Sequence, residues 1–280
     1  MNAPQLSIDR QSPSLWKVTF NNPPINLIDI QTIRELSSLL DEMEHNEDLK
    51  VVVFRSADPE YFLAHWDLLS DRDEVTRLPK GSTGLHPWVD VLIRLSKAPV
   101  ISIADIRGRA RGAGSEFVLA CDMRFASEER GILAQFEVGL GAVPGGNPMA
   151  RLAGLMGRGK TLEVILSADD FPASLAERYG YINRALADAE MEEFVDKLAS
   201  RLASFEKRAL KTVKQLIDDV TLPPNSVFAD SIRAFGASFQ ETSTRSRIAQ
   251  VLQQGLQKRS DVELYLGRAV AQLGQQQTAV

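Results

Sequence analysis

The sequence predicts an α/β core followed by a helical C-terminal region. Short, continuous apolar runs are typical of strands buried on both faces of a parallel sheet, and stretches with helical spacing separate them. Beyond about Pro148 the strand-like runs become rare, and helical spacing dominates from Ala187 to Gly267. We place a boundary near residue 200, which divides the chain into an α/β core (1–200) and a helical region (201–280).

Composition excludes several classes of protein. The 280 residues are 44% hydrophobic and 25% charged, as in an ordinary globular protein rather than a disordered one. A net charge of −5 gives no positive field that could hold nucleic acid. Three scattered histidines and one cysteine are too few for a histidine-based or cysteine-based metal site. We expect no nucleic-acid partner and no metal.

The N-terminus and the single cysteine predict the compartment. The first five residues lack the basic and apolar segments of a signal peptide, and no window approaches the ~20 apolar residues of a membrane helix. Cys121 cannot form an intramolecular disulfide, which fits a reducing compartment. We expect a soluble, cytoplasmic protein without a membrane partner.

The first strand-helix unit lies before residue 55. A strand is predicted over residues 15–20, where apolar positions alternate up to an Asn-Asn-Pro-Pro turn. An amphipathic helix is predicted from residue 30 to about 45, because apolar side chains recur there at helical spacing. Residues 51–54 are continuously apolar, which indicates a strand buried on both faces.

The same alternation continues after residue 85. A helix is predicted over residues 88–95 and a buried strand over 99–103. Small residues at 112–115 open another helix, and the next strand is predicted over 122–126. Residues 181–183 are a further short strand candidate. Strands that alternate with helices in this way imply right-handed crossovers in an α/β core.

Three common catalytic motifs are present only in part or in the wrong structural context. Ser115 has Ala113 and Phe117 where a nucleophile elbow needs glycines. Phe117 also replaces the third glycine of a dinucleotide-binding loop. Residues 154–161 match the bare phosphate-loop pattern, but the preceding segment has the composition of a helix rather than a buried strand. We interpret that match as chance.

Two glutamates stand in unusually apolar surroundings. Glu116 lies at the start of an apolar helix, and Glu137 lies between Phe136 and Val138. A carboxylate in such a place needs partners or takes a raised pKa, which is the property of a general acid or base at neutral pH. The alternatives are a helix N-terminal glutamate for Glu116 and a surface glutamate for Glu137. On these grounds alone the structural roles are preferred.

Three segments, in order, carry a resemblance to a known family. They are Tyr61–Leu68, Pro99–Ala126 and Phe136–Gly146. The first is similar to a Phe-x-Ala-Gly-x-Asp-Leu motif, and the third to a Pro-Glu-x-x-x-Gly-x-x-Pro-Gly-Gly motif. Over most of residues 10–260 the chain resembles the enoyl-CoA hydratase/isomerase family, also called the crotonase family.

The resemblance implies a fold, a substrate and an assembly. The fold is a crotonase-like spiral of strand-strand-helix units with a helical C-terminal region. The substrate is an acyl-CoA thioester, with coenzyme A as part of the substrate and no other cofactor. The C-terminal region packs against neighbouring subunits in such proteins, which implies a homotrimer or a dimer of trimers.

The resemblance also assigns roles to residues. The backbone N–H groups of Ala64 and Ala113 correspond to the oxyanion hole that stabilises a thioester enolate. Glu116 and Glu137 correspond to the two catalytic glutamates of a hydratase. We take Glu116 as the base that activates water and Glu137 as the proton donor to the α carbon. Because both glutamates are retained, enoyl-CoA hydration is the leading interpretation.

The segment beside the first oxyanion donor departs from the family pattern. His65 and Trp66 replace a glycine and a small residue. We interpret His65 as a wall of the pantetheine channel, with an extra acid or base as the alternative, and expect Trp66 to narrow the acyl pocket. The full set of expected substrate-binding residues is Ala64, His65, Trp66, Asp67, Gly112 and Lys258.

Two other functions stay open. The first alternative to a hydratase is a crotonase-like isomerase, hydrolase or decarboxylase that acts on another acyl-CoA. The second is a non-catalytic acyl-CoA-binding subunit whose site is blocked. The retained pair of glutamates favours an enzyme.

Overall fold

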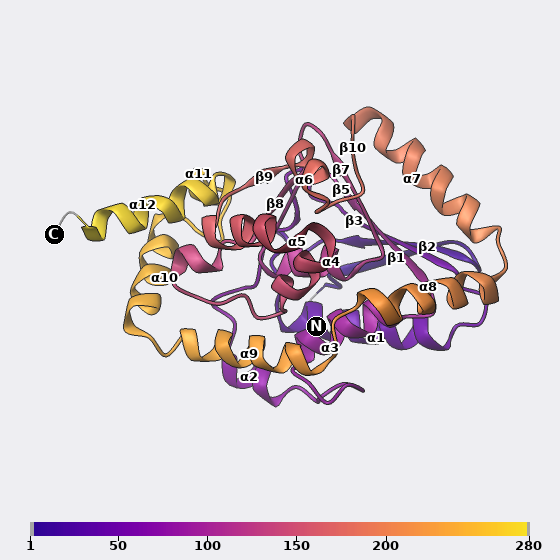
Figure 1. The fold of residues 1–280 in the computed structure, drawn as a ribbon, viewed down its shortest axis with the longest axis horizontal. Coiled ribbons are helices and arrows are strands. Elements are labelled where there is room, and N and C mark those ends of the chain that lie inside the picture. The colour runs from indigo at the N-terminus through magenta and orange to yellow at the C-terminus, as the bar shows by residue number, and fades with distance from the viewer. Residues whose placement is uncertain (1–2, 279–280) are drawn as a thin grey trace.

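Two β-sheets form the centre of the molecule in the computed structural model, which describes residues 3–278 (Figure 1). The six-stranded sheet contains, in spatial order, β1 (Leu6–Ser12), β2 (Leu15–Phe20), β3 (Val51–Ser56), β5 (Ile101–Ile106), β7 (Met123–Ser127) and β10 (Arg184–Leu186). The four-stranded sheet contains β4 (Tyr61–Leu63), β6 (Arg109–Arg111), β8 (Ile132–Ala134) and β9 (Phe171–Pro172). Neighbouring strands pair in parallel, except that β1–β2 and β8–β9 are antiparallel.

The two sheets grow together as a spiral. In each of the pairs β3–β4, β5–β6 and β7–β8, the first strand joins the larger sheet and the second joins the smaller one. This confirms the expected strand-strand-helix spiral. Because β4, β6 and β8 are parallel neighbours, the residues that follow them emerge at one edge of the smaller sheet.

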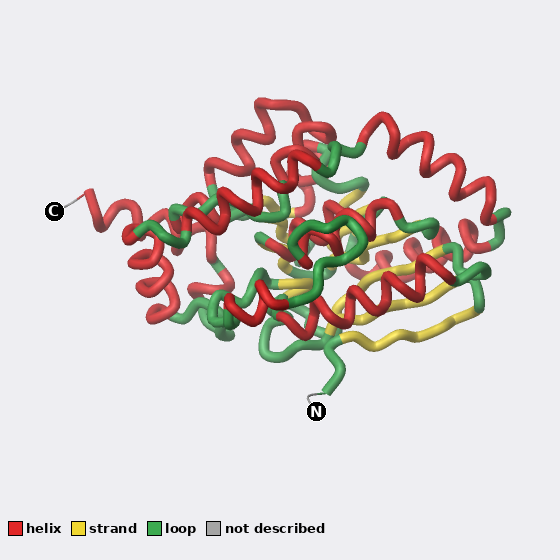
Figure 2. The backbone as a smooth tube through the Cα atoms, turned by 90° about the horizontal axis from the view of Figure 1, so that it is seen from below, coloured by secondary structure: helices red, strands yellow, loops and turns green. Residues whose placement is uncertain are grey.

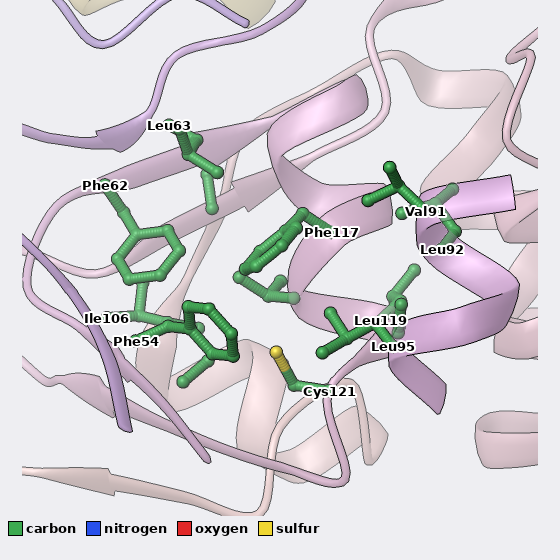
Figure 3. Packing of buried hydrophobic residues seen from close by; sticks show 14 of the residues in the cluster. Phe54, Phe62, Leu63, Val91, Leu92, Leu95, Ile106, Phe117, Leu119 and Cys121 are labelled. Atoms are coloured by element: carbon green, nitrogen blue, oxygen red, sulfur yellow. The ribbon is translucent and has the colours of Figure 1, made fainter. Parts of the chain in front are cut away.

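Helices cover both faces of the larger sheet. On one face lie α1 (Ile30–His45), α3 (Pro87–Lys97) and α4 (Ala113–Ala120), and on the other lies α7 (Asp188–Ala203). Side chains of β3 alternate between the faces: Val52 and Phe54 pack in the first cluster, and Val51 and Val53 pack with α7. Figure 3 shows Phe117 of α4 directed toward Phe54, and the two ring centroids are 5.1 Å apart. Packing against the larger sheet therefore holds α4 in place.

The C-terminal region is helical, as predicted. It contains α8 (Lys207–Thr221), α9 (Ser226–Ser238), α10 (Thr242–Gln254), α11 (Asp261–Leu264) and α12 (Leu266–Thr278). In Figure 2 the long strands lie in the half of the molecule away from the C-terminus. Figure 1 shows α10, α11 and α12 in the half that contains the C-terminus. The remaining helices are α2 (Arg72–Arg77), the 3₁₀ helix η1 (Glu137–Leu140), α5 (Pro148–Ser167) and α6 (Ala173–Tyr179). The predicted boundary at residue 200 falls inside α7, and the division there stays a prediction.

Most elements expected from the sequence are present. The predicted strands correspond to β2, β3, β5 and β7, and the predicted helices to α1, α3 and α4. The strand expected over residues 181–183 is wrong. Residues 181–183 form a bend, in which Tyr181 is buried with its hydroxyl 2.5 Å from Ser115 Oγ, and pairing with β7 begins at Arg184. Residues 154–161, which match the phosphate-loop pattern, lie within α5 across a kink at Gly157, and the segment before them is helical rather than a strand, as expected from the sequence.

Candidate active site

A cavity of about 420 Å³ lies where the strands of the smaller sheet end. Trp66 follows β4, Ala113 follows β6 at the start of α4, and Glu137 follows β8. All three line the cavity together with Glu116. Apolar residues of α2, α9 and α10, and one residue directly after α9, also line the cavity: Val75, Ile232, Phe235, Ile248 and Phe239. Residues far apart in sequence therefore meet because their strands are parallel neighbours.

Glu116 is a buried carboxylate held by two donors. It is 2% exposed and lies in the first turn of α4. The Gly146 N–H donates to Oε1 at 2.7 Å, and the Trp88 indole Nε1–H donates to Oε2 at 2.8 Å. Burial raises the pKa of Glu116, and these two hydrogen bonds oppose the rise. A Cβ at Gly146 would lie 2.3 Å from Oε2, so this close approach needs glycine.

Glu137 differs from Glu116 because no hydrogen-bond donor among the described residues stabilises its ionised form at Oε2. Burial, and then the negative charge of Glu116, raise its pKa to about 8 from the usual 4.5. Its Oε2 is buried and has no hydrogen-bond partner among the residues that the structure describes. A carboxyl in this state is protonated at neutral pH and can donate its proton to a molecule in the cavity.

Two backbone N–H groups border the cavity without an acceptor in residues 3–278. One belongs to Ala113 at the N-terminus of α4, where the helix dipole adds positive potential. The other belongs to Trp66, whose neighbours His65 and Asp67 use their backbone groups to pair with Ile28. Backbone groups alternate in direction along an extended segment, so the Trp66 N–H points away from Ile28.

The prediction for Ala64 is wrong. Its N–H already donates to the Asn26 carbonyl at 3.1 Å, so it is not available to a substrate. The alternation of the strand moves the unpaired N–H two residues onward, to Trp66.

Of the other predicted substrate-binding residues, some line the cavity and others contact the residues around it. Trp66 and His65 line the cavity, but both ring nitrogens of His65 already have partners. The Asp67 carboxylate accepts from Gln257 Nε2 at 2.6 Å and from the Leu69 N–H at 2.9 Å. Gly112 has a φ of 49°, and a Cβ there would lie 2.8 Å from Glu137 Oε1. In this structure Asp67 and Gly112 thus shape the site.

Lys258 lies on the segment after α10, outside the cavity. Its side chain is exposed and forms no ion pair within the described part of the chain. Its neighbour Arg259 is paired with Asp58 and Glu60. A role for Lys258 toward CoA stays a prediction.

Comparison with known proteins supports the geometry. The family model for enoyl-CoA hydratase/isomerase matches residues 10–259. The chain belongs to the enoyl-CoA hydratase/isomerase family. Among relatives, it is 30% identical over 225 residues to the short-chain-enoyl-CoA hydratase of Clostridium acetobutylicum, covering 79% of this chain and 85% of that protein. It is 27% identical over 207 residues to the carnitinyl-CoA dehydratase of Escherichia coli, covering 72% and 76%.

A solved structure extends this likeness to nearly the whole chain. A crystal structure from Streptomyces avermitilis, described as a candidate enoyl-CoA hydratase, is 39% identical with a TM-score of 0.91. It covers 97% of this chain and 98% of that one. The family resemblance inferred from three motifs is thereby confirmed.

Sequence reasoning missed several residues of the enoyl-CoA hydratase/isomerase site. Trp88 lies outside the three family motifs, and its contact with Glu116 joins positions 28 residues apart, so no local pattern indicated it. Gly146 stood inside the third motif, and its double glycine was the available signal. Glu263, which contacts His65, lies in a helix of four residues far along the chain and gave no signal.

The described residues contain no cluster of three or more His, Cys, Asp or Glu side chains suited to a metal ion. Within the same residues, no helix combines the length and apolar character needed to cross a membrane.

Proposed function

We propose that this protein adds water across the double bond of a 2-enoyl-CoA thioester. The observation that carries the proposal is the pair of glutamates facing one cavity: Glu116 is held as an acceptor by two donors, and Glu137 has a pKa raised to about 8. Hydration needs such a pair, since one carboxylate must take a proton from water and one carboxylic acid must give a proton to carbon. The family relatives that are named hydratases support the same reaction.

The backbone donors polarise the thioester. With its carbonyl oxygen between the N–H groups of Trp66 and Ala113, negative charge that develops on that oxygen is stabilised. Glu116 then removes a proton from water as the water oxygen bonds to C3. The electrons of the double bond move toward the carbonyl and form an enolate. Glu137 gives its proton to C2, and one proton passing from Glu116 to Glu137 restores the pair.

The chain's own residues supply all of these groups. We propose that no cofactor is used beyond the coenzyme A of the substrate. Lys258, exposed on the segment after α10, is proposed to contact the CoA phosphates as a point charge. Trp66 is proposed to limit the length of the acyl group, because its side chain lines the apolar cavity.

Hydration of crotonyl-CoA by the purified protein tests the function directly. The reaction is followed by the loss of the absorbance of the conjugated thioester. Because it should need the carboxyl groups of both glutamates, Glu116→Gln and Glu137→Gln should each lower kcat by about 10²-fold or more. Glu128→Gln is the matched control, because Glu128 is exposed and lies outside the cavity. Parent-like hydration by both site variants would show that the assignment is wrong.

The exposed surface supports the proposed trimer or dimer of trimers. Apolar side chains are exposed on α5 and α8, namely Leu155, Leu162, Leu166, Val213, Leu216, Ile217 and Val220. Their exposed fractions reach 63% at Leu216 and 81% at Val220. Leu155, Val213, Ile217 and Val220 line one groove between the two helices. Apolar side chains exposed in this number are typical of a subunit interface. We further propose a cytoplasmic location, which the single, buried Cys121 supports.

A further inference from the structure

His65 belongs to a group of ionisable side chains that connects the cavity with the C-terminal region. Its Nδ1 lies 2.8 Å from the Trp66 carbonyl oxygen, and its Nε2 lies 3.2 Å from Glu263 Oε2. The exposed fractions of His65 and Glu263 are 1% and 0%. Arg111 is equally buried and forms a two-bond ion pair with Asp170.

The partners of His65 determine which ring nitrogen donates to the backbone. A backbone carbonyl can only accept a hydrogen bond, so Nδ1 carries a proton and donates it to the Trp66 carbonyl oxygen. Nε2 shares the second hydrogen bond with Glu263, whose Oε2 also accepts from the Gln257 N–H at 2.9 Å. Glu263 therefore holds the imidazole in the orientation in which Nδ1 faces Trp66.

The hydrogen bond to Trp66 completes the restraint of one backbone segment. The His65 carbonyl accepts from the Ile28 N–H at 2.8 Å, and the Asp67 N–H donates to the Ile28 carbonyl at 2.8 Å. The Trp66 carbonyl is held by the His65 ring. Between the His65 carbonyl and the Asp67 N–H, the Trp66 N–H is the one backbone polar group left unpaired in the described structure. Its direction is thus set by its restrained neighbours.

Glu263 also lies against the strand that leads to the second donor. Arg111 Nη1 donates to the Glu263 carbonyl at 2.6 Å, and Arg111 is the last residue of β6, two positions before Ala113. One short segment near α11 therefore restrains the chain before each of the two unpaired N–H groups.

We propose that His65 and Glu263 are a positioning pair that fixes the Trp66 N–H in the direction of the substrate oxygen. This inference rests on the proposed use of that N–H in catalysis. His65 acts through the Trp66 carbonyl and transfers no proton to the substrate. Loss of the pair should weaken stabilisation of the enolate more than binding of the thioester, because the donor is needed most where charge develops.

Two double variants separate the effect of the hydrogen bond to the Trp66 carbonyl from the effect of the His65–Glu263 contact. In His65→Asn with Glu263→Gln, the asparagine Nδ2 can still donate to the Trp66 carbonyl. In His65→Leu with Glu263→Gln, that donor is absent while the volume is similar. Both replace the two ionisable side chains together, so neither variant leaves one of them buried without its partner, and both should fold. Asp261→Asn serves as a control, because Asp261 is exposed and lies two residues before Glu263.

The readouts are hydration kinetics and the absorbance of bound 4-dimethylaminocinnamoyl-CoA, whose maximum moves to longer wavelength as its carbonyl is polarised. The leucine double variant should lose about tenfold or more in kcat with KM within about threefold, and should show a smaller absorbance shift. The asparagine double variant and Asp261→Asn should stay within about threefold of the parent in kcat. Equal shifts and equal kcat in the two double variants would overturn the positioning role. A parent that shifts the probe but does not hydrate crotonyl-CoA would refute the proposed reaction alone, since the shift still reports the donor.

Discussion

The indole N–H of Trp88 donates a 2.8 Å hydrogen bond to Glu116 Oε2 from the neighbouring helix α3. Trp88 is 4% exposed, and Glu116 receives its other donor from the Gly146 backbone. Each carboxylate oxygen keeps one more acceptor position, so Glu116 can still bind a water in the cavity. The tryptophan therefore orients the proposed base and favours its ionised form.

Trp88→Phe should move the acidic limb of the pH–rate profile to higher pH. A hydrogen bond to a charged group contributes about 1.5–3 kcal/mol, and about 1.4 kcal/mol corresponds to one pKa unit, so we expect the limb to move by roughly one to two pH units. Trp16→Phe is the control, because Trp16 is 3% exposed and lies on β2 outside the cavity. An acidic limb at the same pH in Trp88→Phe and the parent would show that the indole does not act on Glu116.

The parent should lose activity as pH rises through about 8. Glu137 has its pKa raised to about 8 by burial and by Glu116, and a proton donor works only while it is protonated. The profile of kcat/KM against pH measures this, and the residual activity of Glu137→Gln should lack that alkaline limb. A parent profile that stays flat to pH 10 would contradict the assignment of Glu137 as the acid.

The same raised pKa should make Glu137 destabilising at alkaline pH. Below the usual value of 4.5 the carboxyl is protonated in both the folded and the unfolded chain. As pH rises from there to about 8, the unfolded chain releases the proton and the folded chain retains it, so the free energy of unfolding falls. Glu137→Gln should therefore gain stability relative to the parent at pH 8 but not at pH 4. Urea unfolding at the two pH values tests this, and an equal difference at both would refute it.

Trp66→Ala should shift substrate preference toward longer acyl groups. The Trp66 side chain lines the apolar cavity, so its removal leaves space that extra methylenes can fill, each worth about 0.8 kcal/mol of burial. The backbone N–H of residue 66 is kept. We expect kcat/KM for C8 and C12 relative to C4 enoyl-CoA to rise in the variant. An unchanged ratio would show that the indole does not limit the chain.

The purified protein should be a trimer or a dimer of trimers in solution. Leu216 and Val220 are the most exposed apolar side chains of α8, so replacing both with lysine should place charge in the interface and shift the mass toward one chain. Leu69→Lys is the control, because Leu69 is 72% exposed and lies outside α5 and α8. Light scattering measures the mass. A monomeric parent at micromolar concentration would contradict the assembly.

The sequence by itself determined the α/β core, the helical C-terminal region and the family. Apolar runs such as residues 51–54 indicate strands buried on both faces, because such a strand is apolar at every position and is too short to be a buried helix. The apolar neighbours of Glu116 and Glu137 made these two glutamates unusual, and their positions in the family motifs assigned them catalytic roles.

The tertiary structure decided which groups face the cavity. The Ala64 N–H is paired with Asn26, and the Trp66 N–H is free, because the register between two extended segments sets which N–H groups pair. The contacts of Trp88 with Glu116 and of Glu263 with His65 join positions 28 and 198 residues apart. Such contacts depend on how helices pack on the sheets, and no local pattern of residue types encodes that distance.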